Sequence, residues 1–171
     1  MSILEKKIKL VKLFEDDNID KVFKICDQQE AQQLFVEIMS YDCSLDLLEL
    51  GFKYIKDLNY GNDWKLGKDV NPLLWACSNK KNNYIEWLVS NGADVNRLSS
   101  NNTNSIMFSI QRGDYKAFKF LLENDALVEI NDKSIYNYIM KDTVKGFFQE
   151  LIKDILDSKK KNNLLYPDIL K

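Results

Sequence analysis

Apolar residues recur along this chain at three- and four-residue spacing, in short segments that polar turns separate. Residues 19–26, for example, carry Ile19, Val22 and Phe23 in this arrangement. Such spacing places the apolar side chains on one face of a helix. The pattern predicts helices over residues 3–15, 19–26, 31–39, 45–50, 134–140 and 144–156, together with two helices in each of the stretches 71–96 and 104–130.

The two central stretches repeat each other. When one is laid over the other, matched residues are always 33 positions apart: Asn71 falls on Asn104, Leu73 on Ile106, Ile85 on Phe118, Leu88 on Leu121, Gly92 on Asp125 and Val95 on Val128. A constant period in this range is typical of stacked helical repeats, in which each unit packs only against its neighbours. The sequence therefore predicts an all-α solenoid of helix-turn-helix pairs.

These repeats resemble the ankyrin family, whose unit runs G-x-T-P-L-H-x-A-A, a turn, a second helix ending in L-L, and then G-A-D-V-N. The first copy here has Pro72-Leu73-Leu74-Trp75-Ala76-Cys77, and it ends in Gly92-Ala93-Asp94-Val95-Asn96. The second copy has Gly113-Asp114 at the family's G-H turn and Leu121-Leu122 at its L-L. The resemblance implies an ankyrin-repeat solenoid with hairpin-like fingers between the helix pairs.

The repeats depart from the family at the T-P-L-H tetrad. Asn71 and Asn104 replace the threonine, and Ser105 replaces the proline in the second copy. Trp75 and Phe108 stand near the histidine position, and the chain contains no histidine at all. The usual hydrogen bonding between Thr and His is therefore missing, and we expect weaker repeats and not a different fold.

The chain is expected to form one domain over residues 1–171. We expect an N-terminal cap helix pair (1–29), a repeat with a long finger (30–70), two regular repeats (71–103 and 104–133), a C-terminal cap repeat (134–161) and a tail (162–171). Terminal repeats are atypical because one of their faces meets water. The tail either folds back on the last repeat or is a free peptide.

The repeat over residues 30–70 has two features of its own. Gly51 directly follows Leu47–Leu50, and we expect it to end the helix in a left-handed conformation, as Gly92 does in the next repeat. The two glycines are 41 residues apart. The extra residues fall in the turn-rich segment 57–70, which predicts a long hairpin finger that carries Tyr60 and Trp64.

Composition narrows the class of protein. Of the 171 residues, 45% are hydrophobic and 29% are charged, which is ordinary for a folded globular chain. A net charge of −2 and a pI near 5.3 give no general attraction to nucleic acid or to an anionic membrane. No apolar run is long enough for a membrane helix, and lysines interrupt the N-terminal apolar segment. We expect a cytoplasmic protein without nucleic-acid or membrane partners.

No pattern of catalysis, metal binding or cofactor binding is found in the sequence. It has no phosphate-binding glycine loop and no nucleophile elbow. Cys26, Cys43 and Cys77 are far apart and lie in apolar helical patterns, so they are expected to be buried thiols of a reducing compartment. Without histidine, neither zinc ligation nor a Cys–His pair is favoured. We expect no enzyme, no metal and no cofactor.

The resemblance implies that finger tips and inner-helix ends line a concave binding face for another protein. Aromatic residues and arginine carry much of the energy of such interfaces. Trp64 either takes part or packs on the base of its finger, whereas Trp75 and Trp87 are expected in the core. The partner-binding residues carried over to this sequence are Tyr60, Trp64, Lys68, Val70, Ser78, Asn79, Ser100, Asn101, Thr103, Gln111 and Arg112.

The sequence favours a non-enzymatic protein-binding module, monomeric or in a 1:1 complex. One version is an acidic inhibitor or immunity-type protein that blocks a toxin, with salt-sensitive binding. Another is a host-interaction protein of a virus or an intracellular bacterium, and an Asn-, Lys- and Ile-rich composition fits both. The alternative of a different class is a structural or self-assembling protein whose apolar tail docks into a second copy.

Overall fold

The computed structural model describes residues 19–41, 43–64, 67–127, 129–130, 133–134 and 153. The chain divides into two compact units, Met1–Pro72 and Leu73–Lys171, and each is described by itself. The helices predicted over 3–15 and 144–156 lie outside the described residues, apart from Lys153. The predicted boundaries of repeats, caps and tail stay a prediction.

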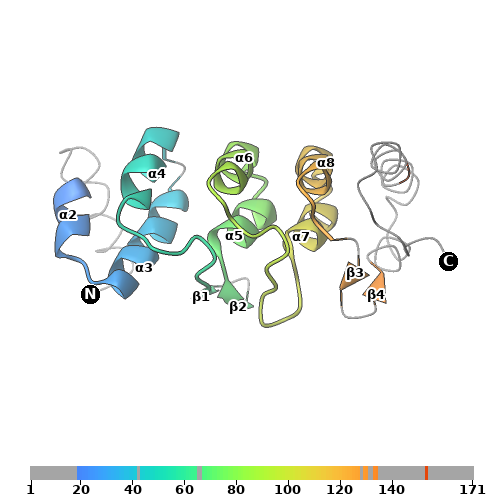
Figure 1. Ribbon diagram of the computed structural model, residues 1–171, viewed down its shortest axis with the longest axis horizontal. Helices are drawn as coiled ribbons and strands as arrows, with labels where there is room; N and C mark the ends of the chain where they lie inside the picture. The colour runs from blue at the N-terminus through green and yellow to red at the C-terminus, as the bar shows by residue number, and fades with distance from the viewer. Residues whose placement is uncertain are drawn as a thin grey trace. The chain divides into compact units, whose positions relative to one another are not determined.

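The first unit contains three described helices and a hairpin (Figure 1). The helices are α2 (Ile19–Ile25), α3 (Gln28–Met39) and α4 (Leu45–Phe52), and α4 packs against both α2 and α3. Asp27 fixes the start of α3: its carboxylate accepts from the Glu30 N–H at 2.9 Å, and Glu30 accepts from the Asp27 N–H at 3.0 Å. This reciprocal pair satisfies two backbone donors that the first helical turn leaves open.

The role predicted for Gly51 is wrong. It lies inside α4, and it is absent from the glycines with positive φ, which are Gly92 and Gly113 in the described residues. A Cβ at this position would meet Phe35 at 3.0 Å and Phe23 at 3.1 Å. Gly51 therefore lies close against two phenyl rings and does not form a turn.

The long finger predicted over residues 57–70 is present as a hairpin. Strands β1 (Asn62–Trp64) and β2 (Gly67–Val70) pair antiparallel, with an irregularity between Asn62 and Trp64. At its base Gly61 lies so close to Asp69 that a Cβ on residue 61 would come within 1.9 Å of the Asp69 carboxylate. Only glycine fits this position without a shift of the opposite strand.

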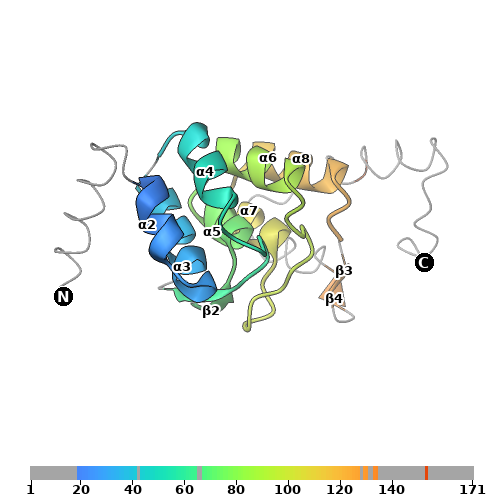
Figure 2. The same ribbon diagram turned by 60° about the vertical axis from the view of Figure 1, so that its left-hand side comes forward.

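The second unit contains two regular helix pairs. The first pair is α5 (Pro72–Ser78), which begins at the boundary between the two units, and α6 (Asn82–Ser90). The second pair is α7 (Ser105–Gln111) and α8 (Tyr115–Glu123). In two views α6 and α8 lie side by side in one layer, and α5 and α7 form a second layer next to it (Figures 1 and 2). The apolar residues matched by the 33-residue period form the core: Leu73, Ile85, Leu88, Ile106, Phe118 and Leu121 are completely buried. Trp75 and Trp87 are also buried, as expected.

The second helix of each pair ends in the same type of turn. After α6 the Ala93 N–H donates to Leu88 O at 3.0 Å, and after α8 the Ala126 N–H donates to Leu121 O at 3.0 Å. This six-to-one bond requires one left-handed residue after the helix. Gly92 (φ 91°) supplies it after α6 and Asp125 (φ 65°) after α8. The 33-residue period therefore extends to the backbone dihedral angles.

Asparagine replaces threonine at the start of α7 without loss of the cap. The Asn104 side chain accepts from the Met107 N–H at 3.0 Å, which is the role of a helix N-cap. After α8 the chain forms a further hairpin from β3 (Glu129–Ile130) and β4 (Lys133–Ser134). The inner helix predicted from residue 134 is therefore wrong at its first residue, and residues 135–140 lie outside the described residues.

Candidate protein-binding surface

The finger between α5/α6 and α7/α8 is a closed loop with a polar tip. Its ends are joined by a bond from the Ser99 N–H to Thr103 O at 3.0 Å, and the Asn102 N–H donates to Ser99 O at 2.9 Å. Ser99 is buried and anchors the loop, whereas Ser100 and Asn101 at the tip are exposed and Thr103 is half-buried. Two predicted binding residues are therefore presented to solvent on a backbone held by its own hydrogen bonds.

The long finger places its predicted residues differently. Tyr60 is half-buried next to Gly61, and Val70 is completely buried. The backbones of Trp64 and Lys68 belong to β1 and β2, and their side chains lie outside the described residues. Val70 was predicted as a partner-binding residue, but it does not reach the surface because its apolar side chain belongs to the core.

The ends of the inner helices carry the remaining predicted residues. Ser78 is 3% exposed, and its hydroxyl donates to Trp75 O at 2.8 Å, so this hydroxyl closes the end of α5 and does not face a partner. Asn79 is exposed, with its amide held by Trp75 O at 2.8 Å and by Ser78 Oγ at 2.9 Å. Gln111 and Arg112, at the corresponding end of α7, are exposed.

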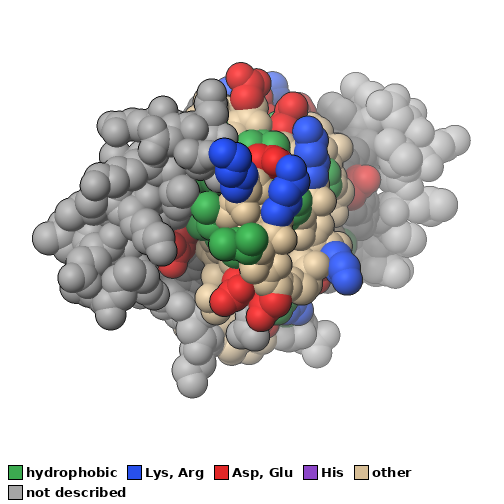
Figure 3. All heavy atoms as spheres, turned by 90° about the vertical axis from the view of Figure 1, so that its left-hand side faces the viewer, with side chains coloured by type: hydrophobic (Ala, Val, Ile, Leu, Met, Phe, Trp, Pro, Cys, Tyr) green, Lys and Arg blue, Asp and Glu red, His purple; other side chains and the backbone are tan. Residues whose placement is uncertain are grey.

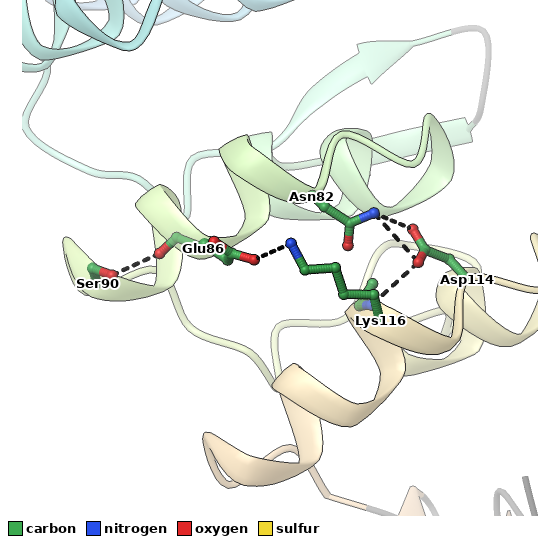
Figure 4. Close-up of polar contacts among 6 residues, drawn as sticks. Asn82, Glu86, Ser90, Asp114 and Lys116 are labelled. Carbon is green, nitrogen blue, oxygen red and sulfur yellow. Dashed lines mark hydrogen bonds and ion pairs between the residues drawn. The ribbon is translucent and has the colours of Figure 1, made fainter.

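Polar residues that the sequence analysis missed join the two helix pairs of the second unit. The Asn82 amide donates to the Asp114 carboxylate at 3.1 Å, and the same carboxylate accepts from the Ala117 N–H at 3.2 Å (Figure 4). Asp114 is only 7% exposed, so both bonds satisfy a buried charge. Asp114 directly precedes an apolar helical segment, and this position could have indicated a helix cap from sequence. Its hydrogen bond with Asn82 could not be predicted from sequence.

Two further contacts bridge the same helix pairs. Lys116 on α8 pairs with Glu86 on α6 at 2.7 Å (Figure 4). Within α6, the Glu86 carbonyl accepts from the Ser90 hydroxyl at 2.6 Å. Asn96, the last residue of the G-A-D-V-N block, donates to Asp125 O at 3.1 Å and accepts from the Leu127 N–H at 2.7 Å. The two pairs are thus joined to each other at three places, and the exposed loops between them form one platform.

In the first unit an acid and a base on α2 lie together with a phenol in the turn after α4. Asp20 forms an ion pair with Lys24 at 2.6 Å and accepts from the Tyr54 hydroxyl. The bonds from Lys24 and Tyr54 lower the pKa of Asp20, and the bond to Asp20 raises the pKa of Tyr54. Figure 3 shows the face at the α2 end, where basic and acidic side chains alternate around a small hydrophobic patch. We interpret the contacts of Asp20, Lys24 and Tyr54 as an attachment of α2 to the turn after α4, because Phe23 also stacks on Tyr54 with ring centroids 5.2 Å apart.

The three cysteines of the chain all lie among the described residues. Cys77 is completely buried, and burial together with the nearby Asp114 charge raises the pKa of its thiol. Cys26 and Cys43 are partly exposed, and none of the three thiols forms a disulfide. Among the described residues no group of three or more Cys, Asp or Glu side chains could hold a metal ion, and no helix has the length and apolar character needed to cross a bilayer.

Helix pairs at a constant period, joined by hairpins and turns with matched hydrogen bonds, define a helical repeat protein. The family pattern described as ankyrin repeats (3 copies) matches residues 36–133, more than half of the chain. The chain belongs to the ankyrin-repeat family. Ankyrin repeats generally mediate protein–protein interaction, and the family is generally a non-enzymatic binding module.

One similar protein is the putative ankyrin repeat protein R598 of Acanthamoeba polyphaga mimivirus. It is 31% identical over 115 residues, which cover 66% of this chain and 34% of that protein. The chain thus matches about a third of the length of this relative. No solved structure matches the chain.

Proposed function

We propose that this protein is a non-enzymatic binding module that recognises a partner protein through its finger tips and the exposed ends of its inner helices. The observation that carries the proposal is the second unit's platform: Ser100, Asn101, Asn79 and Arg112 are exposed on loops that internal hydrogen bonds hold in place, and Gln111 is exposed at the end of α7. A rigid platform favours binding because little conformational entropy is lost when the partner docks.

Two versions of this function differ in the partner. An inhibitor or immunity-type protein would block a toxin in a tight 1:1 complex, and the net charge of −2 suits a basic target. A viral host-interaction protein would bind a host factor, and the similarity to a mimivirus ankyrin protein supports this version. Ankyrin-repeat proteins share a fold but bind different proteins, so the identity of the bound partner distinguishes the two versions.

The test is affinity capture from the source cells, read by mass spectrometry, with the wild-type chain and two variants. Ser100→Arg/Asn101→Arg changes the exposed finger tip, and Lys119→Gln changes an exposed charge on the outer helix α8 as a matched control. We expect a protein that the wild type and the Lys119→Gln variant capture and the finger variant does not. Equal capture by all three would place binding elsewhere and reject the proposed surface.

Self-assembly is the competing function, and Ile25 on α2, which is 82% exposed, is the observation that favours it. Sedimentation equilibrium of the full chain and of an Ile25→Ser variant decides between the two. A monomer over a wide concentration range supports the binding module. A dimer that dissociates in the variant, together with the absence of any captured protein, would replace the module with a self-assembling protein.

A further inference from the structure

Lys80 has a backbone conformation that its side chain does not favour. Its φ is 55°, in the left-handed region, where a Cβ crowds the following carbonyl. One period later the same position is Gly113, with a φ of 61°. The hydrogen bonds also match: the Lys81 N–H donates to Ala76 O at 3.0 Å, and the Asp114 N–H donates to Ser109 O at 2.8 Å. Glycine therefore meets the structural requirement of this turn without the cost that Lys80 carries.

The other left-handed residues of the described chain have an evident reason for their conformation. Besides glycine they are Asp69, Asn102 and Asp125. Short Asp and Asn side chains tolerate this region because they hydrogen-bond locally, whereas lysine has no such side chain. A residue held in an unfavourable conformation where a better one exists is a reason to look for a function of its side chain.

The surroundings of Lys80 indicate what that function is. Lys80 and Arg112 are exposed, and Lys81 is half-buried, so three cationic residues lie in the two loops that join the inner to the outer helices. The hydrogen bond from Asn82 to Asp114 at 3.1 Å holds these loops together (Figure 4). Asp114 adds little opposing charge at the surface, because it is 7% exposed and already accepts from Asn82 and from the Ala117 N–H.

We propose that this basic edge, formed by Lys80, Lys81 and Arg112, docks an acidic segment of the partner protein. The inference rests on the proposed protein-binding function and names the chemistry of its partner. Lysine and arginine side chains form charge-assisted hydrogen bonds with carboxylates. A protein segment fits better than nucleic acid, because three cations can match a few carboxylates of a peptide but provide too few phosphate contacts for nucleic-acid binding.

The test is an NMR titration of the full, isotope-labelled chain at low ionic strength with a blocked decaglutamate peptide. We expect saturable shifts of the backbone amides of Lys80, Lys81, Arg112 and Gly113. Lys80→Gly and Arg112→Gln should each raise the Kd about fivefold, the upper range for one exposed ion pair. Lys119→Gln, which removes one exposed charge from α8, should leave the Kd unchanged.

Lys80→Gly separates the charge from the fold, because glycine is the residue that the next repeat uses at this position. Its thermal midpoint should equal or exceed that of the wild type while its affinity falls, an outcome that a purely structural lysine would not give. The proposal is overturned if decaglutamate shifts no amides at this edge, or if Lys80→Gly binds as well as the wild type.

A parallel titration with oligothymidylate distinguishes the class of ligand. A higher Kd than with decaglutamate supports an acidic protein segment, and a lower Kd at the same amides overturns it in favour of nucleic acid. The affinity capture keeps the two proposals apart. A protein lost with the finger variant but retained by Lys80→Gly leaves the binding module intact and removes the basic edge from it.

Discussion

Asn96 and Leu127 join successive repeats through one short hydrogen bond: the Asn96 side-chain oxygen accepts from the Leu127 N–H at 2.7 Å. The nitrogen of the same amide donates to Asp125 O at 3.1 Å, so a single side chain holds the turn that follows α8. Asparagine is suited to this position because its amide offers one acceptor and two donors. The final residue of the G-A-D-V-N block therefore connects one repeat to the next.

Replacing this amide should weaken the second unit. We expect Asn96→Ala to lower the free energy of unfolding by about 1–2 kcal/mol, because two backbone groups lose their partner. Asn96→Asp keeps the acceptor and loses the donor, so it should fall between the alanine variant and the wild type. Urea unfolding followed by circular dichroism measures both. The exposed Asn83→Ala serves as control, and a loss as large as that of Asn96→Ala would contradict the interpretation.

The left-handed positions give a pair of opposite predictions. Lys80→Gly should raise the free energy of unfolding by about 0.5–1 kcal/mol, because removal of the Cβ strain outweighs the added freedom of the unfolded chain. Gly113→Ala should lower it by about 1–2 kcal/mol, because it introduces that strain at the matching position. Thermal and urea unfolding check both signs. Lys80→Ala, which keeps the Cβ, should remain close to the wild type.

Gly51 gives a prediction about packing. Gly51→Ala should destabilise the first unit by about 1 kcal/mol, because the overpacking against Phe23 and Phe35 exceeds the gain in helix propensity. Combining it with Phe23→Leu, which makes room on one side, should cost less than the sum of the two single changes. Additive costs in a double-mutant cycle, measured by urea unfolding, would show that the Cβ does not meet Phe23.

The group formed by Asp20, Lys24 and Tyr54 predicts a pH dependence. Bonds from Lys24 and Tyr54 lower the pKa of Asp20, so the folded state favours the carboxylate. Its contribution to stability is therefore present above the unfolded pKa, near 4, and is lost as pH falls through the lower folded value. Urea midpoints between neutral and acidic pH should fall less steeply in Asp20→Asn than in the wild type. Tyr54→Phe, which removes one of the two bonds, should lie between them, and identical slopes in all three would contradict the assignment.

The periodic part of the fold followed from the sequence. Residues 33 apart, such as Leu88 and Leu121, were matched by pattern, and both are completely buried at the same place in successive helix pairs. The long finger between residues 57 and 70 was also predicted from its turn residues and is present as the β1/β2 hairpin. These features depend on helical spacing and on turn chemistry, which act over a few residues and are visible in a single chain.

The tertiary structure decided what depends on contacts between distant residues. Gly51 was predicted to end a helix and instead makes room for Phe23 and Phe35, and Val70, a predicted binding residue, is buried. The hydrogen bond from Asn82 to Asp114, which holds together the two loops of the basic edge, likewise appears in no local sequence pattern. The sequence alone determined the repeat and its class of protein. Packing selected which of its surface candidates reach solvent, because burial depends on neighbours that the fold brings together from far along the chain.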